Sequence, residues 1–395
     1  MKNSALKKFI SALLCAAILF SLVGCGKAVV PDPLKPLLVR QPFSRQPEAH
    51  ASAASRFANE VPELPEETDP PLEPIDPELP GMLFLAEEYA EGTPSVFSAP
   101  GPVPVNSLIP VRVPMDRALA SAGRFPDGMR LEAYQAFVYH VNTGKMVALR
   151  GDGQDIYPAS VTKLLTILTA LQYLDPEMEV TPGDEIYKPE KNSSLAYLTK
   201  AYTLTVRQLV EGMMIPSGND ASYVLSVNAA RTALNDPELS TSECVDWMVA
   251  RMNDYAEMLG MDSSHFSNVD GYWCYDHITT IEDMARLALA AYNCPAIREC
   301  CGIAEITETL LSGHSITWTN SNLMLDPTTE VYDERVKGMK TGSISGNNCL
   351  VAILEEDGEV YLTGVFGCPD KIGRYRDVLK ILAWLFPEEN EEVAE

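Results

Sequence analysis

The residues with the clearest chemical potential are a serine and a lysine in Ser160-Val161-Thr162-Lys163. Their spacing of three puts the hydroxyl and the amine on one face of a helix, one turn apart. A serine hydroxyl is a weak nucleophile alone, but a neighbouring amine can take its proton where burial and nearby positive charge lower the lysine pKa. The motif therefore indicates a nucleophile and its base, and a helix N-terminus at this point would add backbone N–H groups for an oxyanion.

Two further motifs lie downstream of this pair. Ser217-Gly218-Asn219, between two predicted helices, would present a hydroxyl and an amide to a cleft, and Lys340-Thr341-Gly342 occurs once, just before a predicted hairpin. Each motif also has a purely structural interpretation. The alternatives are a capping serine with a lysine that reaches solvent, a helix-capping loop, and a lysine that protects an exposed edge strand.

The elements that must position these motifs follow from hydrophobic periodicity. Ser160–Leu174 is predicted to be a helix with almost no polar face, so it should be buried, and a lysine inside it is unusual. Other helices are expected at Thr205–Met214, Asp220–Arg231, Ser242–Leu259, Thr279–Tyr292 and Lys371–Phe386. Hairpins are expected from Tyr134–Val141 with Met146–Arg150, and from Asn348–Glu355 with Glu359–Phe366. Strands at both ends with helices between predict an α+β domain whose antiparallel sheet is built from terminal pieces.

Composition excludes several classes of protein. The chain has 395 residues and a net charge of −25, which argues against a nucleic-acid partner because no basic footprint is present. Of its nine cysteines, Cys15 and Cys25 belong to the N-terminal segment. The other seven match no zinc-ligand spacing, and we expect most of them to be small buried hydrophobes, with no pair assigned.

The N-terminus resembles the export signal of bacterial lipoproteins. Basic residues precede an uncharged apolar run over Phe9–Val23, which is shorter than a comfortable membrane span. The run ends in Leu22-Val23-Gly24-Cys25, a lipobox-like sequence, so residues 1–25 are interpreted as a lipoprotein signal peptide and Cys25 as the lipidated residue. Two acyl chains there would anchor the exported protein at the outer face of the cytoplasmic membrane. An ordinary signal peptide or an uncleaved anchor helix is the alternative.

Residues 26–126 are predicted to be a proline-rich acidic linker, largely disordered. Most of the 29 prolines fall in this range, and such a segment cannot bury enough apolar surface to offset its ordering entropy. Within it, Gly81–Tyr89 and Val105–Leu119 carry apolar residues that could pack on the domain. Residues 127–386 are expected to form one folded domain, and 387–395 an acidic tail.

Taken together and in this order, the three motifs resemble those of the low-molecular-mass penicillin-binding proteins that act as serine D-alanyl-D-alanine carboxypeptidases, peptidase family S11. The resemblance covers about two-thirds of the chain and extends to the blocks Tyr157–Lys163, Met214–Ala221, His265–Gly271 and Gly338–Ser343. It implies the penicillin-binding protein and β-lactamase-like fold, a five-stranded antiparallel sheet flanked by helices, with the cleft beside an edge strand. No β-rich C-terminal domain is expected, because the residues after Gly342 are used by the closing hairpin and helix.

The resemblance implies a catalytic group of four residues. Ser160 would attack the D-Ala-D-Ala carbonyl and become acylated, with Lys163 as its base. Ser217 would relay a proton between the lysines and the leaving amine. Asn219 would bind the amide backbone of the substrate and steady Lys163.

It likewise implies a set of substrate-binding residues. Lys340 and Thr341 would receive the terminal carboxylate, and Gly342 would let the substrate backbone approach the strand. The backbone N–H groups of Ser160 and Ser343 would form the oxyanion hole. The implied partners are peptidoglycan stem peptides ending in D-Ala-D-Ala and β-lactams, with no metal or organic cofactor.

Other functions remain open from the sequence. A β-lactamase of the same fold needs a deacylating glutamate, typically in a Glu-x-x-Leu-Asn block between the second and third motifs, and none occurs. A wall endopeptidase or transpeptidase would keep every motif. An inactive wall-binding lipoprotein is disfavoured by the intact motifs. A Ser-His-Asp hydrolase fits less well, because there is no Gly-x-Ser-x-Gly elbow and the five histidines are scattered.

Replacement of Cys25 tests the anchor. Cys25→Ala should release the protein from the membrane fraction, because the side chain that carries the lipid is gone. Fractionation and intact-mass measurement check this outcome. Unchanged membrane retention with residues 1–24 still present would instead indicate an uncleaved helix.

Overall fold

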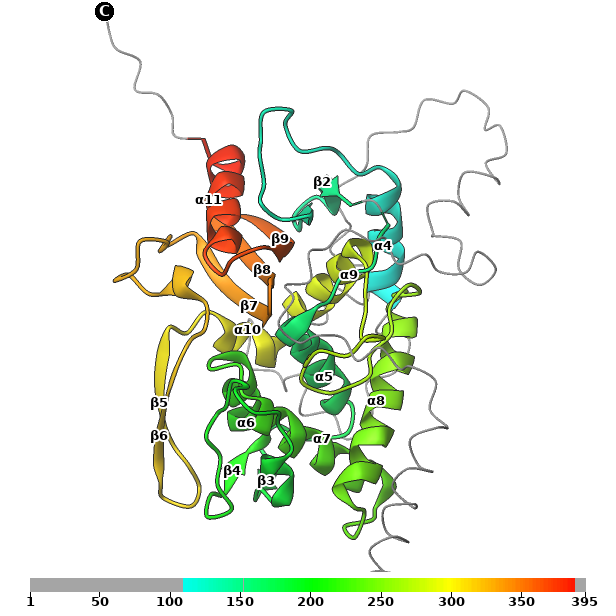
Figure 1. Cartoon of the computed structure of the whole chain (residues 1–395), viewed down its shortest axis with the longest axis vertical. Coiled ribbons are helices and arrows are strands. Elements are labelled where there is room, and N and C mark those ends of the chain that lie inside the picture. Colours follow the sequence, from blue (N-terminus) through cyan, green and yellow to red (C-terminus); the bar gives the residue numbers. More distant parts are fainter. Residues whose placement is uncertain (1–108, 152, 388–395) are drawn as a thin grey trace, which may run out of the picture. The chain divides into compact units, whose positions relative to one another are not determined.

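The computed structural model describes residues 109–151 and 153–387 of the protein (Figure 1). Its centre is a five-stranded antiparallel sheet in the order β2-β1-β9-β8-β7, so the predicted α+β fold is confirmed. The strands come from both ends of this region: β1 (Gln135–His140), β2 (Lys145–Arg150), β7 (Val336–Ile344), β8 (Asn347–Glu356) and β9 (Glu359–Cys368). Both hairpins predicted from the sequence form, and β2 and β7 are the two edge strands of the sheet.

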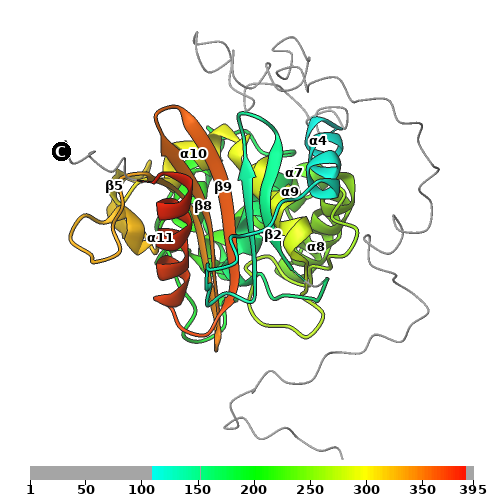
Figure 2. The same ribbon diagram turned by 90° about the horizontal axis from the view of Figure 1, so that it is seen from above.

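Strand β8 shows how the sheet is covered on both faces. Its side chains alternate between two hydrophobic clusters, with Val351 and Ile353 in the larger and Leu350 and Ala352 in the smaller. The smaller cluster lies under helix α11 (Gly373–Leu385), and the larger one is shared with the helical region. Figure 2 shows the resulting layers, with α11 on one face of the sheet and the other helices on the opposite face.

Helix α5 (Thr162–Ala170) lies at the centre of the helical region, and all nine of its residues are buried, as its apolar sequence predicted. It packs against α7, α8 and α9. The other helices here are α6 (Val206–Met214), α7 (Asn219–Leu234), α8 (Thr241–Met258), α9 (Ile281–Tyr292) and α10 (Pro295–Cys301). Capping boxes begin α6 at Thr205 and α8 at Ser240, and they fix where these helices start.

Several elements were not predicted from the sequence. They are the helix α10, the short pair β3 (Glu179–Val180) and β4 (Leu204–Thr205), and the hairpin of β5 (Glu305–Thr309) and β6 (Ser315–Thr319). Short 3-10 turns occur at Ala159–Val161 (η3), Asp184–Tyr187 (η4) and Leu323–Leu325 (η5). The seven cysteines from Cys244 to Cys368 are all free, and six of them are buried.

Helix α4 (Ile109–Ala120) lies inside the range assigned to the linker, so the folded region begins earlier than residue 127. Met115 and Ala118 are buried in the main core, and Asp116 forms an ion pair with Arg286 of α9. Leu119 packs against the same core, so Met115, Ala118 and Leu119 carry this packing at the end of the stretch whose apolar residues were expected to pack on the domain. The signal segment 1–25, the linker up to residue 108 and the tail from 388 lie outside the described residues.

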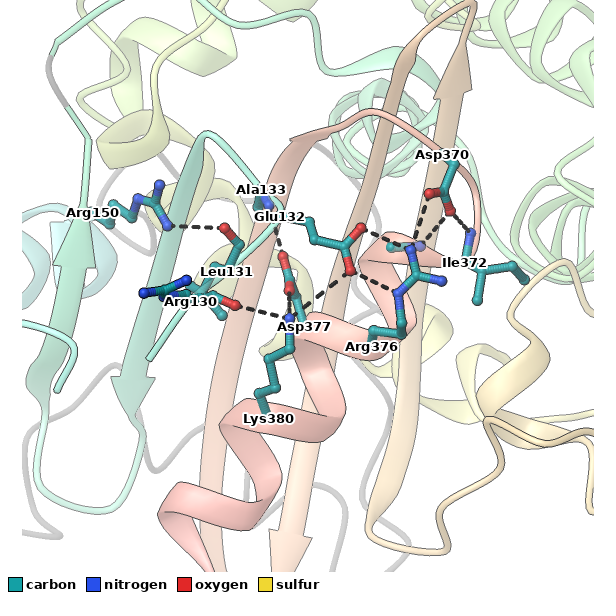
Figure 3. Close-up of polar contacts among 11 residues, drawn as sticks. Arg130, Leu131, Glu132, Ala133, Arg150, Asp370, Ile372, Arg376, Asp377 and Lys380 are labelled. Atoms are coloured by element: carbon teal, nitrogen blue, oxygen red, sulfur yellow. Dashed lines mark hydrogen bonds and ion pairs between the residues drawn. The ribbon is translucent and has the colours of Figure 1, made fainter. Parts of the chain in front are cut away.

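A polar cluster fixes α11 to the segment that leads into β1 (Figure 3). Asp377 is fully buried, and it accepts hydrogen bonds from the Ala133 N–H at 2.7 Å and from Lys380 Nζ at 2.9 Å. Glu132 accepts two hydrogen bonds from Arg376, at 2.7 and 2.8 Å, and Arg376 also pairs with Asp370. The cluster sets the position of α11 on the sheet, and through it the position of every side chain that α11 carries.

Asp377 should contribute more to stability than its exposed neighbours. Asp377→Ala leaves the buried Ala133 N–H without a partner, which should lower the free energy of unfolding by about 1–3 kcal/mol. Glu132→Ala is the control, because the Glu132–Arg376 pair is partly exposed and should cost about 0–1 kcal/mol. Urea titration measures both. Equal losses would mean that the buried hydrogen bond is not what fixes α11.

Candidate active site

Ser160 lies in the turn η3 immediately before α5, between two segments that press on it from either side. Ala159 has a φ of 49°, a left-handed conformation that is uncommon outside glycine. A Cβ atom at Gly271 would overlap the Ala159 carbonyl oxygen, and one at Gly342 would lie 2.8 Å from the Pro158 oxygen. Edge strand β7 therefore runs directly beside the turn. The close neighbour that requires glycine at position 342 is the chain's own backbone, a different reason from the substrate approach that the resemblance implied.

Lys163 is fully buried, and its amine has three oxygen neighbours. Nζ lies 2.9 Å from Ser160 Oγ, 2.7 Å from Asn219 Oδ1 and 2.8 Å from the main-chain oxygen of Asp270. The amide and carbonyl oxygens can only accept hydrogen bonds, so each takes one hydrogen from the amine. A neutral amine then has its lone pair left for the Ser160 hydroxyl. This geometry aims the base at the nucleophile.

The pKa of Lys163 suits that task. Burial is the largest cause and lowers the pKa to about 8, while the carboxylates of Asp270 and Asp220 act in the opposite direction. A substantial fraction of the amine is therefore neutral near pH 8, whereas an exposed lysine would be almost wholly protonated. The lysine that seemed anomalous in a buried helix is thus held where it can act as a base.

The second motif is fixed at the start of α7. Asn219 is the first residue of the helix, and its N–H donates to the Ser194 carbonyl at 2.8 Å. Ser217 is 4% exposed with a φ of 64°, and a Cβ atom on Gly218 would meet Gly212 oxygen at 2.7 Å. The motif forms the loop between α6 and α7, no side chain of it caps α7, and the loop delivers Asn219 to Lys163.

The third motif lies on β7. Lys340 is 1% exposed, so the interpretation of an exposed, protective lysine is wrong. Burial, with the charges of Lys163 and Arg374, lowers the pKa of Lys340 well below its ordinary value. Thr341 Oγ1 lies 2.7 Å from Ser321 Oγ, and Ser343 is exposed further along the strand. A Cβ atom at Gly342 would lie 3.4 Å from the Ser160 nitrogen, so the first and third motifs share one site.

Two positioning residues were missed from the sequence. Arg374 of α11 is buried and donates to the Gly342 carbonyl at 2.9 Å and to Ser343 Oγ at 3.0 Å, so it holds β7 from behind. His277 accepts from the Ser267 N–H through Nδ1, so its Nε2–H donates to Thr162 Oγ1 at 2.8 Å. No local pattern distinguishes either residue, because each acts on a distant part of the chain.

His277 is a buried histidine with a structural task. Burial lowers its pKa to about 4, so the ring is neutral and holds the first turn of α5. Because the folded pKa lies below that of a free histidine, its contribution to stability is present above about pH 6.5 and is lost as the pH falls toward 4.

Comparison with known protein families agrees with the catalytic arrangement described above. The model of the D-alanyl-D-alanine carboxypeptidase family, peptidase S11, matches residues 122–369, more than half of the chain. The chain belongs to this family, and the resemblance inferred from the three motifs is confirmed. Within residues 109–151 and 153–387, no three histidine, cysteine or acidic side chains come together as metal ligands, and no helix is long and apolar enough to cross a membrane.

Individual relatives are distant but consistent. D-alanyl-D-alanine carboxypeptidase DacF of Bacillus subtilis is 26% identical over 262 residues, covering 65% of this chain and 63% of the relative. The DacD enzyme of Escherichia coli is 28% identical over 257 residues, so the match spans about 60% of the length of these relatives. The crystal structure of the Streptomyces K15 DD-transpeptidase matches with a TM-score of 0.58 and 25% identity, over 65% of this chain and 97% of that one. Penicillin-binding protein 6B of Escherichia coli matches with a TM-score of 0.56 and 26% identity, over 67% and 81%.

Gly271 and Gly342, which lie against the backbone of the η3 turn, should not tolerate a side chain. Gly342→Ala should lower the free energy of unfolding by about 1–3 kcal/mol through overpacking. Gly271→Ala should cost more, because its φ of 79° adds about 1–2 kcal/mol of backbone strain. Gly128→Ala is the control, since nothing lies within 4 Å of the added atom. Urea unfolding ranks the three, and a Gly342→Ala protein as stable as Gly128→Ala would refute the tight contact.

Proposed function

We propose that this protein is a serine-type D-alanyl-D-alanine carboxypeptidase that removes the terminal D-Ala from peptidoglycan stem peptides. The observation that carries the proposal is the placement of the Lys163 amine, whose two acceptor-only neighbours leave its lone pair for Ser160. Membership of the D-alanyl-D-alanine carboxypeptidase family supports the choice of substrate.

Acylation begins at Ser160. As Oγ bonds to the carbonyl carbon of the D-Ala-D-Ala peptide, its proton passes to the Lys163 amine. The carbonyl oxygen gains negative charge, which the backbone N–H groups of Ser160 and Ser343 stabilise. The C–N bond then breaks, and the leaving D-Ala amine receives a proton through Ser217. Asn219 keeps Lys163 oriented and hydrogen-bonds the substrate backbone.

The terminal carboxylate binds where positive charge is concentrated. Lys340 and Thr341 of β7 receive it, and the Arg374 guanidinium behind the strand adds to the potential. Burial is the main cause that lowers the pKa of Lys340. An arriving carboxylate opposes that effect and favours the ammonium form, so binding of the carboxylate and protonation of Lys340 support each other.

Deacylation completes the cycle. Water attacks the acyl-serine and gives its proton to Lys163. As the ester bond breaks and the shortened peptide leaves, Lys163 returns that proton to Ser160 Oγ, so both groups regain their starting state. A β-lactam acylates Ser160 through the same kind of ester bond. Its opened ring stays attached to the acyl group, and hydrolysis of that adduct is slow. Penicillin is therefore expected to act as an inhibitor.

The proposal includes the location of the enzyme. Residues 1–25 serve as the signal, Cys25 carries a lipid, and the proline-rich part of the chain before α4 spaces the catalytic domain from the outer face of the cytoplasmic membrane. The domain itself is proposed to extend to about residue 386, followed by the acidic tail. An enzyme of the cell wall needs this placement, because its substrate lies outside the membrane.

Labelling and D-Ala release test the function together. Fluorescent penicillin should form a long-lived adduct on Ser160, detected by intact mass and peptide mapping, and a peptide ending in D-Ala-D-Ala should release D-Ala. Lys163→Arg should lose about three or more decades in rate, because a guanidinium stays protonated and cannot act as a base. Lys340→Arg is the matched comparison and should retain more activity, because its task is to hold a negative charge.

Each alternative function has a different outcome. Turnover of penicillin many times per second would replace the carboxypeptidase with a β-lactamase. Cleavage of cross-linked dimers without D-Ala release would indicate an endopeptidase. No label on Ser160, or D-Ala release that survives Lys163→Arg, would refute the Ser–Lys mechanism.

A further inference from the structure

The segment that follows α8 brings the main chain of an acidic residue, Asp270, into contact with the proposed base. Asp270 is 1% exposed, and its main-chain oxygen accepts from Lys163 Nζ at 2.8 Å. The preceding carbonyl, of Val269, accepts from Thr166 Oγ1 at 2.8 Å, so α5 holds this segment at two successive residues. Asp270 also lies in the interval between the second and third motifs, where the sequence showed no deacylating glutamate block.

The side chain of Asp270 is only half satisfied. Oδ1 accepts from the N–H of Tyr272 at 3.0 Å, while Oδ2 is buried and has no hydrogen-bond partner among the described residues. A buried carboxyl oxygen without a partner is costly, and such groups in native proteins call for an explanation. A cation that forms nearby during the reaction would explain why Asp270 Oδ2 has no hydrogen-bond partner.

The charged groups around this pair come from several elements. The carboxylates of Asp270 and, on α7, Asp220 act electrostatically on Lys163, and Lys163 acts in the same way on Lys340 of β7. Asp270 in turn interacts with Glu190 and with the phenol of Tyr223. Lys163 is the cation among the causes that act on Asp270.

Asp220 does not have the same freedom. Its carboxylate oxygens accept hydrogen bonds from the N–H groups of Ala196 at 2.7 Å and Leu198 at 2.9 Å, and so it fixes the loop before α6. The negative charge of Asp220 is thus spread over donors that do not change in the reaction. Asp270, by contrast, has one carboxyl oxygen, Oδ2, without a hydrogen-bond partner among the described residues.

We propose that Asp270 is a positioning residue for Lys163, whose main-chain oxygen orients the amine and whose carboxylate stabilises the ammonium formed when the amine takes the Ser160 proton. The inference rests on the proposed function and deepens it. The amine reacts in its neutral form. During attack the proton leaves Ser160 Oγ and binds Nζ, so a positive charge appears in a buried site, and an adjacent carboxylate offsets the cost of that charge.

The protonation states support the same conclusion. Burial raises the pKa of Asp270, and the charge of Lys163 opposes that rise. Asp270 opposes the fall in the pKa of Lys163 in the same way. The two groups titrate as a coupled pair, so removal of one charge must change the titration of the other.

The test is the pH dependence of acylation. Asp270→Asn removes the charge but keeps the main-chain oxygen and an oxygen for the Tyr272 N–H. Single-turnover labelling of Ser160 by fluorescent penicillin, from pH 5 to 10, should show an acid limb near pH 8 in the native protein. In Asp270→Asn the limb should move to lower pH, because the ammonium is less stable. The plateau rate should fall about tenfold, because the weaker base accepts the proton less readily.

Three further variants make the result specific. Asp270→Glu keeps the charge and should keep the acid limb close to the native pH. Asp270→Ser is a second neutral variant, for use if the asparagine protein does not fold. Asp283→Asn is the matched control, because Asp283 is 3% exposed and burial raises its pKa to about 6, yet Lys163 is absent from the groups acting on it. Its acid limb should not move.

The proposal would be overturned if the acid limb of acylation stayed at the native pH in both neutral variants of Asp270. It would also be overturned if the limb moved as far in Asp283→Asn, or in Asp270→Glu, as it does in Asp270→Asn. These outcomes are distinct from a failure of the proposed function. If native Ser160 takes no label, the Ser–Lys mechanism falls. If it takes the label and only the shift is missing, the mechanism stands and the role of Asp270 falls.

Discussion

The rest of the site depends on one buried amine. Lys163 can be a base only because it is out of water, which lowers its pKa to about 8, and because two of its neighbours are oxygens that cannot donate. Burial without those acceptors would leave polar hydrogens unsatisfied, and acceptors without burial would leave the amine protonated. The helix around it must therefore be apolar on nearly every face, and its acceptors must come from other elements.

Those elements are held by contacts that lie outside the reaction. Gly271 and Gly342 let two backbones press on the turn before α5, so the position of Ser160 is set by packing. The buried Asp377 fixes α11, and α11 carries Arg374 behind strand β7. Stability and chemistry are linked in this way, because a change in the anchoring of α11 reaches the strand that is proposed to bind the substrate carboxylate.

The sequence predicted what is local. The Ser160–Lys163 spacing, the buried helix and the two hairpins follow from patterns of a few residues, and the structure contains all of them. It could not predict the contacts of Asp270 and His277, which lie 107 and 115 residues from their partners on α5. The edge strand β7 was expected only from the resemblance and from Lys340, and its bounds did not follow from periodicity, because it is buried along most of its length rather than alternating. The hairpin β5–β6 could have been predicted, because two short strands of alternating burial flank a turn sequence, Ser312-Gly313.

The central claim is that Lys163 is neutral when the enzyme works, and its titration tests this most directly. NMR of protein with isotope-labelled lysine side chains, assigned by difference against Lys163→Ala, reports the protonation of Nζ as the pH is raised. The account predicts a midpoint near pH 8 for Lys163, well below that of the exposed lysines. A midpoint at or above the ordinary value of 10.5 would contradict it, because the amine would then be an ammonium throughout the working range and could not take the serine proton.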